Sequence, residues 1–503
     1  MNTCAGDPAA IQKKMARQSG QHGLPPYLSE LARLEFVLFQ ARTTADQIPD
    51  RIDEIIINPT LSVWSSPWRH LCGLISGAGP VAPEPGEEML LVWVEPRTGT
   101  PRARPATDND LLILKMVAED IPLETVAAQG DITPGQVWAR MQMTARKGLI
   151  LTPPSAIRRD PEVFPPISGL NPEVYVSSVF TLQWHVTQAC DLNCRHCYDR
   201  ADLPPLPYDR ALTILEDFTR FCRAKQVSGH ISFSGGNPLL YPHFTDLYRA
   251  ASINGFSLGI LGNPAGRDRL EELMAIEKPA FYQVSLEGLP DHNDYIRGPG
   301  HFERTLAFLD LLRDLDIYSM VMLTLTRDNL DQVIPLAEIL EGRADLFTFN
   351  RLALVGRGKD LLLPEKSAYL SFLHDYLDAS RRLAVVARKD NLLNAVLHDQ
   401  GQPLFGGCTG HGCGAAFNFV SLLPDGAVHA CRKFPSPIGQ VFAQSLEEIY
   451  DSAAARQYRA GPGECRGCSL RPVCGGCLAV AHSLGLNIFE QKDPFCPGRP
   501  SEG

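Results

Sequence analysis

The sequence has neither a long apolar run nor an excess of positive charge. No stretch reaches the roughly 18 apolar residues that a membrane helix needs, and the segment MNTCAGDPAAIQKKMARQSG lacks the apolar core of a secretory signal. The 503 residues carry 47 Lys and Arg against 57 Asp and Glu, which gives a formal net charge of −10. We therefore expect a cytoplasmic protein with no membrane partner, and the charge disfavours a dedicated nucleic-acid binder.

Cysteine is absent from long parts of the chain and crowded in two others. Residues 1–189 hold two cysteines and residues 223–407 hold none, whereas residues 190–222 hold four and residues 408–496 hold eight. Thiols that serve only core packing would not gather in this way, and a reducing cytoplasm disfavours disulfides. The distribution predicts two regions that bind soft metals.

The sequence of the first third of the chain predicts a helical region, a small domain and a linker. Residues 1–80 are expected to be a helical region, because Leu28, Leu31 and Leu38 repeat at helical spacing. Residues 81–155 begin with a hairpin pattern and continue with three short helices and a strand-like exit, the order of a winged helix-turn-helix domain. The Pro-rich residues 156–179 are expected to be a linker.

The remainder of the chain changes to alternating patterns. Residues 180–365 alternate strand and helix about six times, which predicts an α/β fold whose parallel sheet curls into a partial (β/α)6 barrel. Ligands of such a barrel gather at the carboxyl ends of its strands. A helical bridge over 366–405 leads to a Cys-rich C-terminal domain over 406–499, which we expect to be held together by metal because it lacks long periodicity.

Three cysteines follow the first expected barrel strand with the spacing C-x3-C-x2-C: Cys190, Cys194 and Cys197. Four thiolates close a 4Fe–4S cluster, whereas three leave one iron open to a further ligand. An open metal position is the mark of a catalytic site. A zinc site completed by His185 or His196 is the alternative interpretation.

This spacing, after the first strand of a (β/α)6 barrel, resembles the radical SAM superfamily. The resemblance implies that the three cysteines hold a 4Fe–4S cluster that binds S-adenosylmethionine (SAM) and cleaves it to a 5′-deoxyadenosyl radical. It also implies a set of SAM contacts: His196, Ser234, Gly235, Gly236, Asn237, Ser285, Glu287 and Arg297. His196 holds the position near the adenine, Ser285 and Glu287 match the ribose and carboxylate region, and Arg297 suits the SAM carboxylate.

The motif that meets the SAM amino group in this family is Gly-Gly-Glu, and here it is Gly235-Gly236-Asn237. The glycines allow the main chain to approach the ligand closely. Asn237 departs from the usual Glu, because its side-chain carbonyl can accept a hydrogen bond from an ammonium group but brings no charge.

The tail carries eight further cysteines: Cys408, Cys413, Cys431, Cys465, Cys468, Cys474, Cys477 and Cys496. Eight thiolates suffice for two Cys4 sites. Zinc ribbons usually separate their two C-x2-C pairs by about 15–20 residues. Only five residues separate the two pairs here, which favours neighbouring clusters that share one segment, as in ferredoxins. Zinc in the tail is the alternative.

The tail resembles the SPASM extension of radical SAM enzymes, which implies two auxiliary 4Fe–4S clusters and three clusters in all. The resemblance places the nearer cluster on Cys408, Cys413, Cys431 and Cys477. It places the further cluster on Cys465, Cys468, Cys474 and Cys496. The C-x2-C spacing of Cys474 and Cys477 is one residue shorter than the usual spacing. The remaining cysteines, Cys4, Cys72 and Cys222, fall outside both patterns, and Cys222 lies on the apolar face of an expected helix.

One departure bears on the reaction. SPASM members that oxidise Cys or Ser to formylglycine have an Asp base directly after the cysteine that is Cys431 here, whereas this chain has Arg432 and Lys433. A pair of cations is a poor general base at neutral pH. The sequence therefore argues against sulfatase maturation.

The combined resemblance implies a peptide maturase. Radical SAM–SPASM enzymes that modify ribosomally made peptides often carry a winged-helix element that binds a leader peptide as an added strand on its hairpin edge. The resemblance implies that residues 81–155 bind the leader in this way. We therefore expect oxidation of a precursor peptide, to a thioether or another crosslink, with an external electron donor such as flavodoxin or ferredoxin. The stretches QWHVTQACDLNCRHCYDR and SGGNPLL are similar to those of the thio(seleno)oxazole, or selenobiotic, peptide maturases.

Two alternatives remain open. One is a radical SAM maturase of a folded protein, of the sulfatase or quinone-cofactor type. The other is an Fe–S redox-sensing regulator whose winged helix binds DNA.

Overall fold

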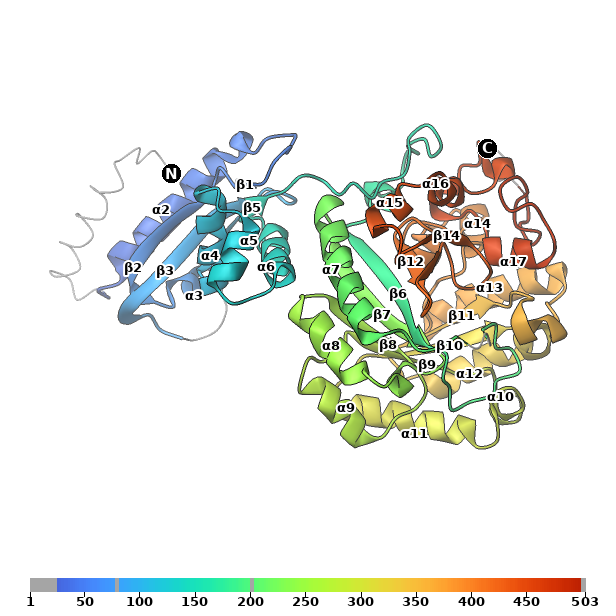
Figure 1. Ribbon diagram of the computed structural model, residues 1–503. Coiled ribbons are helices and arrows are strands. Elements are labelled where there is room, and N and C mark those ends of the chain that lie inside the picture. Colours follow the sequence, from blue (N-terminus) through green and yellow to red (C-terminus); the bar gives the residue numbers. More distant parts are fainter. Residues whose placement is uncertain (1–24, 77–80, 200–202, 499–503) are drawn as a thin grey trace. The chain divides into compact units, whose positions relative to one another are not determined.

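The computed structural model describes residues 25–76, 81–199 and 203–498, which fall into two compact units. The first unit ends at Pro154 and the second begins at Ser155 (Figure 1). Cys4 lies outside the described residues. Within them, no helix combines the length and the apolar character that crossing a bilayer requires.

The first unit is built on a three-stranded antiparallel sheet in the order β2-β3-β4 (Figure 1). Its helices and strands are α2 (Leu28–Thr43), β1 (Ile56–Ile57), β2 (Ser62–Arg69), α3 (Leu71–Ser76), β3 (Glu84–Glu95), β4 (Thr100–Pro105), α4 (Asp108–Ala118), α5 (Leu123–Gln129), α6 (Pro134–Arg146) and β5 (Ile150–Leu151). Leu34 and Ala41 of α2 pack against Leu90, Val92 and Val94 of β3 and so form the core of this unit. Cys72 is buried in the same core.

The expectation of an all-helical region over residues 1–80 is wrong for β2. Trp64, Ser66 and Trp68 are buried or half-buried and alternate with exposed Val63, Ser65 and Pro67, and this period of two is the signature of a half-buried strand. β2 pairs with β3 along its length, so that the sheet spans the expected boundary at residue 81.

The hairpin β3–β4 and the three helices α4, α5 and α6 follow in the order that the sequence predicts. Thr107 and Thr133 cap α4 and α6, and each forms a capping box with the residue three positions later. The exit strand β5 differs from a wing, because it pairs with β1 and not with the hairpin.

The second unit contains a nine-stranded sheet in the order β11-β10-β9-β8-β7-β6-β12-β13-β14. Its strands are β6 (Val179–Thr187), β7 (Ser228–Gly235), β8 (Ser257–Leu261), β9 (Phe281–Ser285), β10 (Ser319–Leu325), β11 (Leu346–Arg351), β12 (Phe419–Leu422), β13 (Ala427–His429) and β14 (Pro437–Gln440). The strands β6 to β11 are parallel neighbours, which confirms the predicted partial (β/α)6 barrel.

Helices follow the parallel strands and cover the outside of the barrel (Figure 1). They are α7 (Tyr208–Ala224), α8 (Phe244–Ile253), α9 (Arg267–Met274), α10 (Pro290–Arg297), α11 (His301–Asp314) and α12 (Val333–Leu340). The predicted apolar face of α7, which includes Ala211, Phe218 and Cys222, is buried as expected. Burial also raises the pKa of the Cys222 thiol, so this cysteine is a core residue.

The Cys-rich tail contains regular helices and strands, and its strands extend the barrel sheet. After α13 (Lys366–Arg382) and α14 (Leu393–Asp399), strand β12 adds to β6 in parallel, and β13 and β14 extend the sheet antiparallel. The short helices α15 (Leu446–Tyr450), α16 (Ala453–Ala460) and α17 (Leu478–Ser483) follow. Because β12 runs parallel to β6, the tail loop that precedes β12 lies at the amino end of β6.

The Pro-rich segment 156–179 does not behave as a free linker. Ser155 donates a hydrogen bond to the carbonyl of Ser177 at 2.6 Å, which folds the segment back on itself. The guanidinium of Arg159 donates to the carbonyls of His411 and Cys413 at 2.5 and 2.7 Å. These bonds fasten the segment to the tail.

Candidate functional site

A cavity of about 630 Å³ extends along the parallel strands, from their carboxyl ends at Ser234 and Ser285 to their amino ends at Phe281 and Met320. Side chains of the loop after β6 and of the tail line it together: Cys190, Cys194, Cys197, Cys408, Cys413, Cys431 and Cys477. Ser234, Gly235, Gly236, Ser285 and Arg297 also line it. The cavity therefore joins the predicted catalytic cysteines to the cysteines of the predicted nearer cluster.

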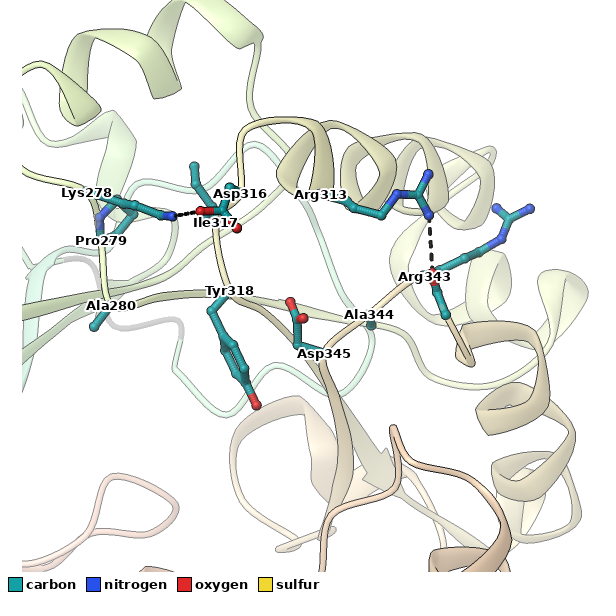
Figure 2. A pocket seen from close by; sticks show the side chains of 11 residues that line it. Lys278, Pro279, Ala280, Arg313, Asp316, Ile317, Tyr318, Arg343, Ala344 and Asp345 are labelled. Carbon is teal, nitrogen blue, oxygen red and sulfur yellow. Dashed lines mark hydrogen bonds and ion pairs between the residues drawn. The ribbon is translucent and has the colours of Figure 1, made fainter. Parts of the chain in front are cut away.

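A second hollow, of about 580 Å³, lies at the amino ends of β9, β10 and β11 (Figure 2), and no cysteine is among its lining residues. Its charged groups already have partners. Lys278 pairs with Asp316 at 2.5 Å, and Asp345 accepts hydrogen bonds from the main chain and hydroxyl of Ser319. These contacts stabilise the loops that precede the strands. The charged side chains involved are already paired and do not form a catalytic group.

The first cysteine loop brings its three thiols together. Burial raises the pKa of the Cys194 thiol, and negative charge on Cys190 and Cys197 adds to the rise, whereas Arg297 opposes it. Nitrogen donors also face the sulfurs, with Arg297 Nη1 at 3.8 Å from Cys194 Sγ and Asn263 Nδ2 at 3.6 Å from Cys190 Sγ. Such donors stabilise thiolate ligands of a cluster.

Gly235 and Gly236 let the end of β7 lie directly against this loop. A Cβ on Gly236 would lie 2.3 Å from the carbonyl oxygen of Ala189, and one on Gly235 would lie 2.0 Å from that of Thr187. The main-chain N–H of Gly236 donates to Thr187 at 3.0 Å. Any larger side chain here would push the strand end away from Cys190.

The amide of Asn237 binds the carboxylate of Asp191, a contact that the sequence motif does not indicate. Asn237 Nδ2 donates to Asp191 Oδ1 at 3.0 Å, and Asn263 Nδ2 donates to the same oxygen at 2.6 Å. Both Asn residues are buried, whereas Asp191 is exposed. A negative charge thus stands next to the position where the family has Glu, although neither Asn237 nor Asp191 lines the cavity, which Asn263 does.

Glu287 and Arg297 form a buried ion pair, with Arg297 Nη2 at 2.5 Å from Glu287 Oε1. Burial alone would raise the pKa of Glu287, but His196, Arg297 and the N–H of Thr324 together hold that pKa below its usual value. Glu287 is absent from the cavity wall, where Arg297 stands in front of it. Glu287 therefore positions Arg297, and a direct contact of Glu287 with SAM stays a prediction.

His196 lies beside this pair, with Nε2 3.5 Å from Glu287 Oε1. Burial lowers the pKa of His196 to about 4, and Arg297 and His292 add to the fall. The ring is therefore neutral at pH 7. It lines the cavity, as expected for a residue near a ligand ring.

The tail cysteines have two sets of neighbours, and their roles as ligands of two clusters stay a prediction. Burial raises the pKa of Cys413 to about 12, and the neighbours that add to this rise are Cys431, Cys408 and Cys477. Burial likewise raises the pKa of Cys465 to about 11, and there the neighbouring thiols are Cys468 and Cys496. Burial also raises the pKa of Cys474, with Cys465 and Cys496 as neighbours.

The short spacer between Cys474 and Cys477 explains how adjacent cysteines reach different groups. Gly475 and Gly476 both have positive φ, +73° and +62°, a conformation that other residues rarely adopt. A Cβ on Gly476 would lie 2.5 Å from Cβ of Asp493. The two glycines reverse the chain in the least possible length, so that Cys474 and Cys477 face opposite sides.

The cations after Cys431 bridge the cavity. Arg432 pairs with Asp199, and its guanidinium lies 5.1 Å from the ring centroid of Tyr198 in the loop after Cys197. Lys433 donates to the carbonyl of Arg351 at 2.8 Å and faces Cys477 Sγ at 3.9 Å. Arg432 is thus engaged in a structural ion pair, which agrees with the argument against a base at this position.

The cysteine groups fit iron–sulfur clusters by their chemistry. A neutral thiol must lose its proton to bind metal, and buried thiols with raised pKa values do so when the metal supplies the positive charge. In the described parts of the chain, no three His, Cys, Asp or Glu side chains approach closely enough to enclose a single metal ion. The fit therefore rests on the grouping of the thiols and on the N–H donors that face them.

Comparison with known proteins agrees with this arrangement. The radical SAM superfamily model matches residues 184–340, and the model of the SPASM iron–sulfur cluster-binding domain matches residues 413–477. The chain carries a radical SAM domain and a SPASM domain. It is therefore a radical SAM enzyme, and the two domains imply SAM and 4Fe–4S clusters as cofactors.

Relatives of this radical SAM–SPASM chain have different names. An AdoMet-dependent heme synthase of Methanosarcina barkeri is 26% identical over 351 residues, which are 64% of this chain and 97% of the relative. Mycofactocin maturase MftC of Mycolicibacterium smegmatis is 26% identical over 338 residues, which are 63% of this chain and 82% of the relative.

Among solved structures, Streptococcus suis SuiB bound to S-adenosylmethionine has a similar fold, with a TM-score of 0.52 at 17% identity. The likeness covers 82% of this chain and 97% of SuiB. SuiB has also been solved bound to its precursor peptide SuiA, with a TM-score of 0.51 at 15% identity. Because 82% is more than the second unit contains, the shared fold extends into the first unit.

Proposed function

We propose that this enzyme is a peptide maturase that oxidises a ribosomally made precursor peptide. The observation that carries the proposal is the cavity, which has the first cysteine set on one wall and the nearer tail set on the other. A residue held there is within reach of both sets. The precursor peptide bound in the SuiB structure and the maturase name of MftC support a peptide as the substrate.

The first unit favours this proposal over a heme synthase. The match to the heme synthase covers 97% of that relative but only 64% of this chain, whereas the likeness to SuiB continues into the first unit. An added unit of sheet and helices is suited to holding an extended peptide. A small tetrapyrrole substrate would not require it.

Different residues of the chain have different roles in this proposed reaction. Cys190, Cys194 and Cys197 would hold a 4Fe–4S cluster. When reduced in the presence of SAM, this cluster would supply a 5′-deoxyadenosyl radical. Gly235 and Gly236 keep the strand end close to this loop, and Arg297, held by Glu287, presents its guanidinium to the cavity. The glycine pair and the fixed cation preorganise the site before SAM arrives.

The proposed reaction removes two electrons and two protons from the peptide. Removal of one hydrogen atom leaves a radical on the substrate, and loss of one proton and one electron then allows a new bond, such as a thioether, to form. The nearer and further tail sets are proposed to hold two auxiliary 4Fe–4S clusters that receive this electron. A one-electron carrier such as flavodoxin or ferredoxin removes it and also reduces the first site.

Anaerobic reconstitution with iron and sulfide tests the proposal. Three 4Fe–4S clusters require about twelve iron atoms per chain, and reduction in the presence of SAM is expected to yield 5′-deoxyadenosine. Addition of a short peptide encoded beside this gene is expected to give a product that has lost two hydrogens. Absence of 5′-deoxyadenosine would refute the enzyme's proposed reaction.

Peptide binding is expected to depend on the first unit. Removal of residues 1–154 leaves Ser155 and Ala156 bonded within the second unit, to Ser177 and Lys225, so the cut does not break its sheet. We expect this shortened chain to lose peptide binding, measured by fluorescence anisotropy, and to retain SAM cleavage without peptide. Unchanged peptide binding would contradict the role of the first unit, and binding of random duplex DNA by the full chain would favour the regulator.

The edge that takes the peptide is expected to be β2 and not the hairpin. On β4 the main-chain groups of Pro101, Ala103 and Pro105 face outward, and the two prolines have no N–H to donate. On β2 the N–H groups of Val63 and Ser65 face away from β3. Ser65→Pro should therefore weaken peptide binding, whereas Ser65→Ala should not.

Asp191 is expected to supply the charge that Asn237 lacks toward the SAM amino group. Because a hydrogen bond to a charged group is worth about 1.5–3 kcal/mol, Asp191→Asn should weaken SAM binding at least about tenfold in equilibrium dialysis. The exposed Asp375→Asn variant is the matched control. Adding Asn237→Glu to Asp191→Asn should restore binding, and equal affinities in all variants would exclude a role for Asp191.

A further inference from the structure

Three arginines meet between the two tail cysteine groups. Arg159 comes from the segment that precedes the barrel, Arg459 from α16, and Arg471 from the loop between Cys468 and Cys474. All three line a small cavity of about 20 Å³, whose other walls include Cys413, Cys465 and Cys474. This cavity thus touches one cysteine of the nearer set and two of the further set.

Two of these three guanidiniums are buried, and in the part of the chain that the structure describes none of the three has a carboxylate within ion-pair distance. Arg159 and Arg471 are each only 5% exposed. Their hydrogen bonds go to main-chain carbonyls: Arg159 donates to His411 and Cys413, and Arg471 donates to Ala460 at 2.6 Å. Arg159 Nε and Arg471 Nη1 are buried with no hydrogen-bond partner.

Arg459 completes the group. It donates to the carbonyls of Tyr450 and Ala416 at 2.7 and 3.1 Å, again without a carboxylate. The ring of Phe164 lies between Arg159 and Arg471, at 4.6 and 4.8 Å from their guanidinium carbons. Ring contacts and carbonyls lower the cost of burying Arg159 and Arg471 but do not neutralise the charges of the group.

Buried charges in proteins are normally paired, and breaking such a pair is costly. For Arg159 and Arg471 the neighbouring acidic groups include cysteine thiols, whereas Arg459 lies nearer to Tyr450 and Asp451. Burial lowers the pKa of Arg159, and negative charge on Cys413 acts in the opposite direction. Burial likewise lowers the pKa of Arg471, and negative charge on Cys465 opposes that fall. Metal clusters held by four thiolates carry net negative charge, so they would supply the missing counter-charge.

Near the first cysteine set, in contrast, the buried positive charge has a carboxylate partner. Its buried cation, Arg297, is paired with Glu287. At the tail, the buried carboxylates Asp390 and Asp493 are engaged by Arg351, and Lys433 adds a further cation facing Cys477. Positive charge without a carboxylate partner therefore accumulates around the tail sets and is cancelled at the first set.

We propose that Arg159, Arg459 and Arg471 raise the reduction potential of the tail clusters above that of the SAM-binding cluster. This inference rests on the proposed function, because it assigns iron–sulfur clusters to both tail sets. Adding one electron makes a cluster more negative, and nearby unscreened cations stabilise that form. The electron that leaves the substrate, as its proton goes to solvent, is then held at the tail until a one-electron carrier protein removes it.

The test uses the full chain in which Cys190, Cys194 and Cys197 are Ala, so that all iron signals come from the tail. Redox titration followed by electron paramagnetic resonance gives the potentials of these clusters. Arg471→Gln should lower them, with a change on the order of tenfold in the ratio of reduced to oxidised cluster, about 59 mV for one electron. Arg471→Lys, which keeps the charge, should restore most of the shift.

Arg466→Gln is the matched control, because Arg466 adjoins Cys465 but is exposed, where solvent screens its charge. Equal shifts in Arg466→Gln and Arg471→Gln, or an intact signal with unchanged potential in Arg471→Gln, would overturn the inference alone. Absence of any tail cluster in the parent chain would overturn the proposed function with it. If Arg471→Gln loses iron, Arg459→Gln, whose side chain is partly exposed, provides the same measurement.

Discussion

Replacing Cys190, Cys194 and Cys197 together with Ala is expected to abolish formation of 5′-deoxyadenosine while leaving about two-thirds of the bound iron. The three thiols are the only protein ligands expected for the SAM-binding cluster, and removal of all three leaves no site for it. The tail groups come from other elements and do not depend on this loop. About eight iron atoms per chain should remain.

The matched control for this experiment is Cys222→Ala. Cys222 lies within the same group of four cysteines in the sequence, but it is fully buried on α7 and faces the barrel core. Its loss should leave iron content and SAM cleavage near those of the parent and cost only a small amount of stability. Iron counts by colorimetry and 5′-deoxyadenosine by chromatography decide the outcome. Retained SAM cleavage in the triple variant would contradict the assignment.

Much of this site could be predicted from sequence because its ligands are local. The C-x3-C-x2-C loop and the Gly235-Gly236 turn lie within short stretches, and the sheet order brings them together. The six parallel strands are also local signals, since each is a short apolar run followed by a helix. The spacing of the first three cysteines therefore indicated one part of the cavity wall, whereas the nearer tail set was assigned by the family resemblance.

What the sequence did not predict depends on contacts between distant segments. Nothing in the spacing links Asp191 to Asn263, or Arg159 to the carbonyl of Cys413. The tail strands β12 to β14 have three or four residues each, too few for a periodic signal. They are stabilised by adding to β6, which only the folded barrel provides.

The largest loss of stability is expected from Arg351→Leu. Arg351 ends β11 with its side chain 2% exposed, and it donates from Nε to Asp390 at 2.8 Å and from Nη1 and Nη2 to Asp493 at 3.0 and 2.5 Å. Asp493 in turn accepts from the N–H of Cys477 at 2.8 Å. Removing the guanidinium would leave two buried carboxylates without their cation.

Breaking a buried pair of this kind costs about 3–5 kcal/mol of unfolding free energy. Urea unfolding followed by circular dichroism under anaerobic conditions should show the fall, and iron at the nearer tail set should drop because Cys477 loses its support. Arg381→Gln is the control, since Arg381 and Asp378 also lie 2.5 Å apart but are 41% and 67% exposed. Exposed pairs contribute about 0–1 kcal/mol. A midpoint for Arg351→Leu equal to that of Arg381→Gln would show that Arg351 does not join β11 to the cluster-binding tail.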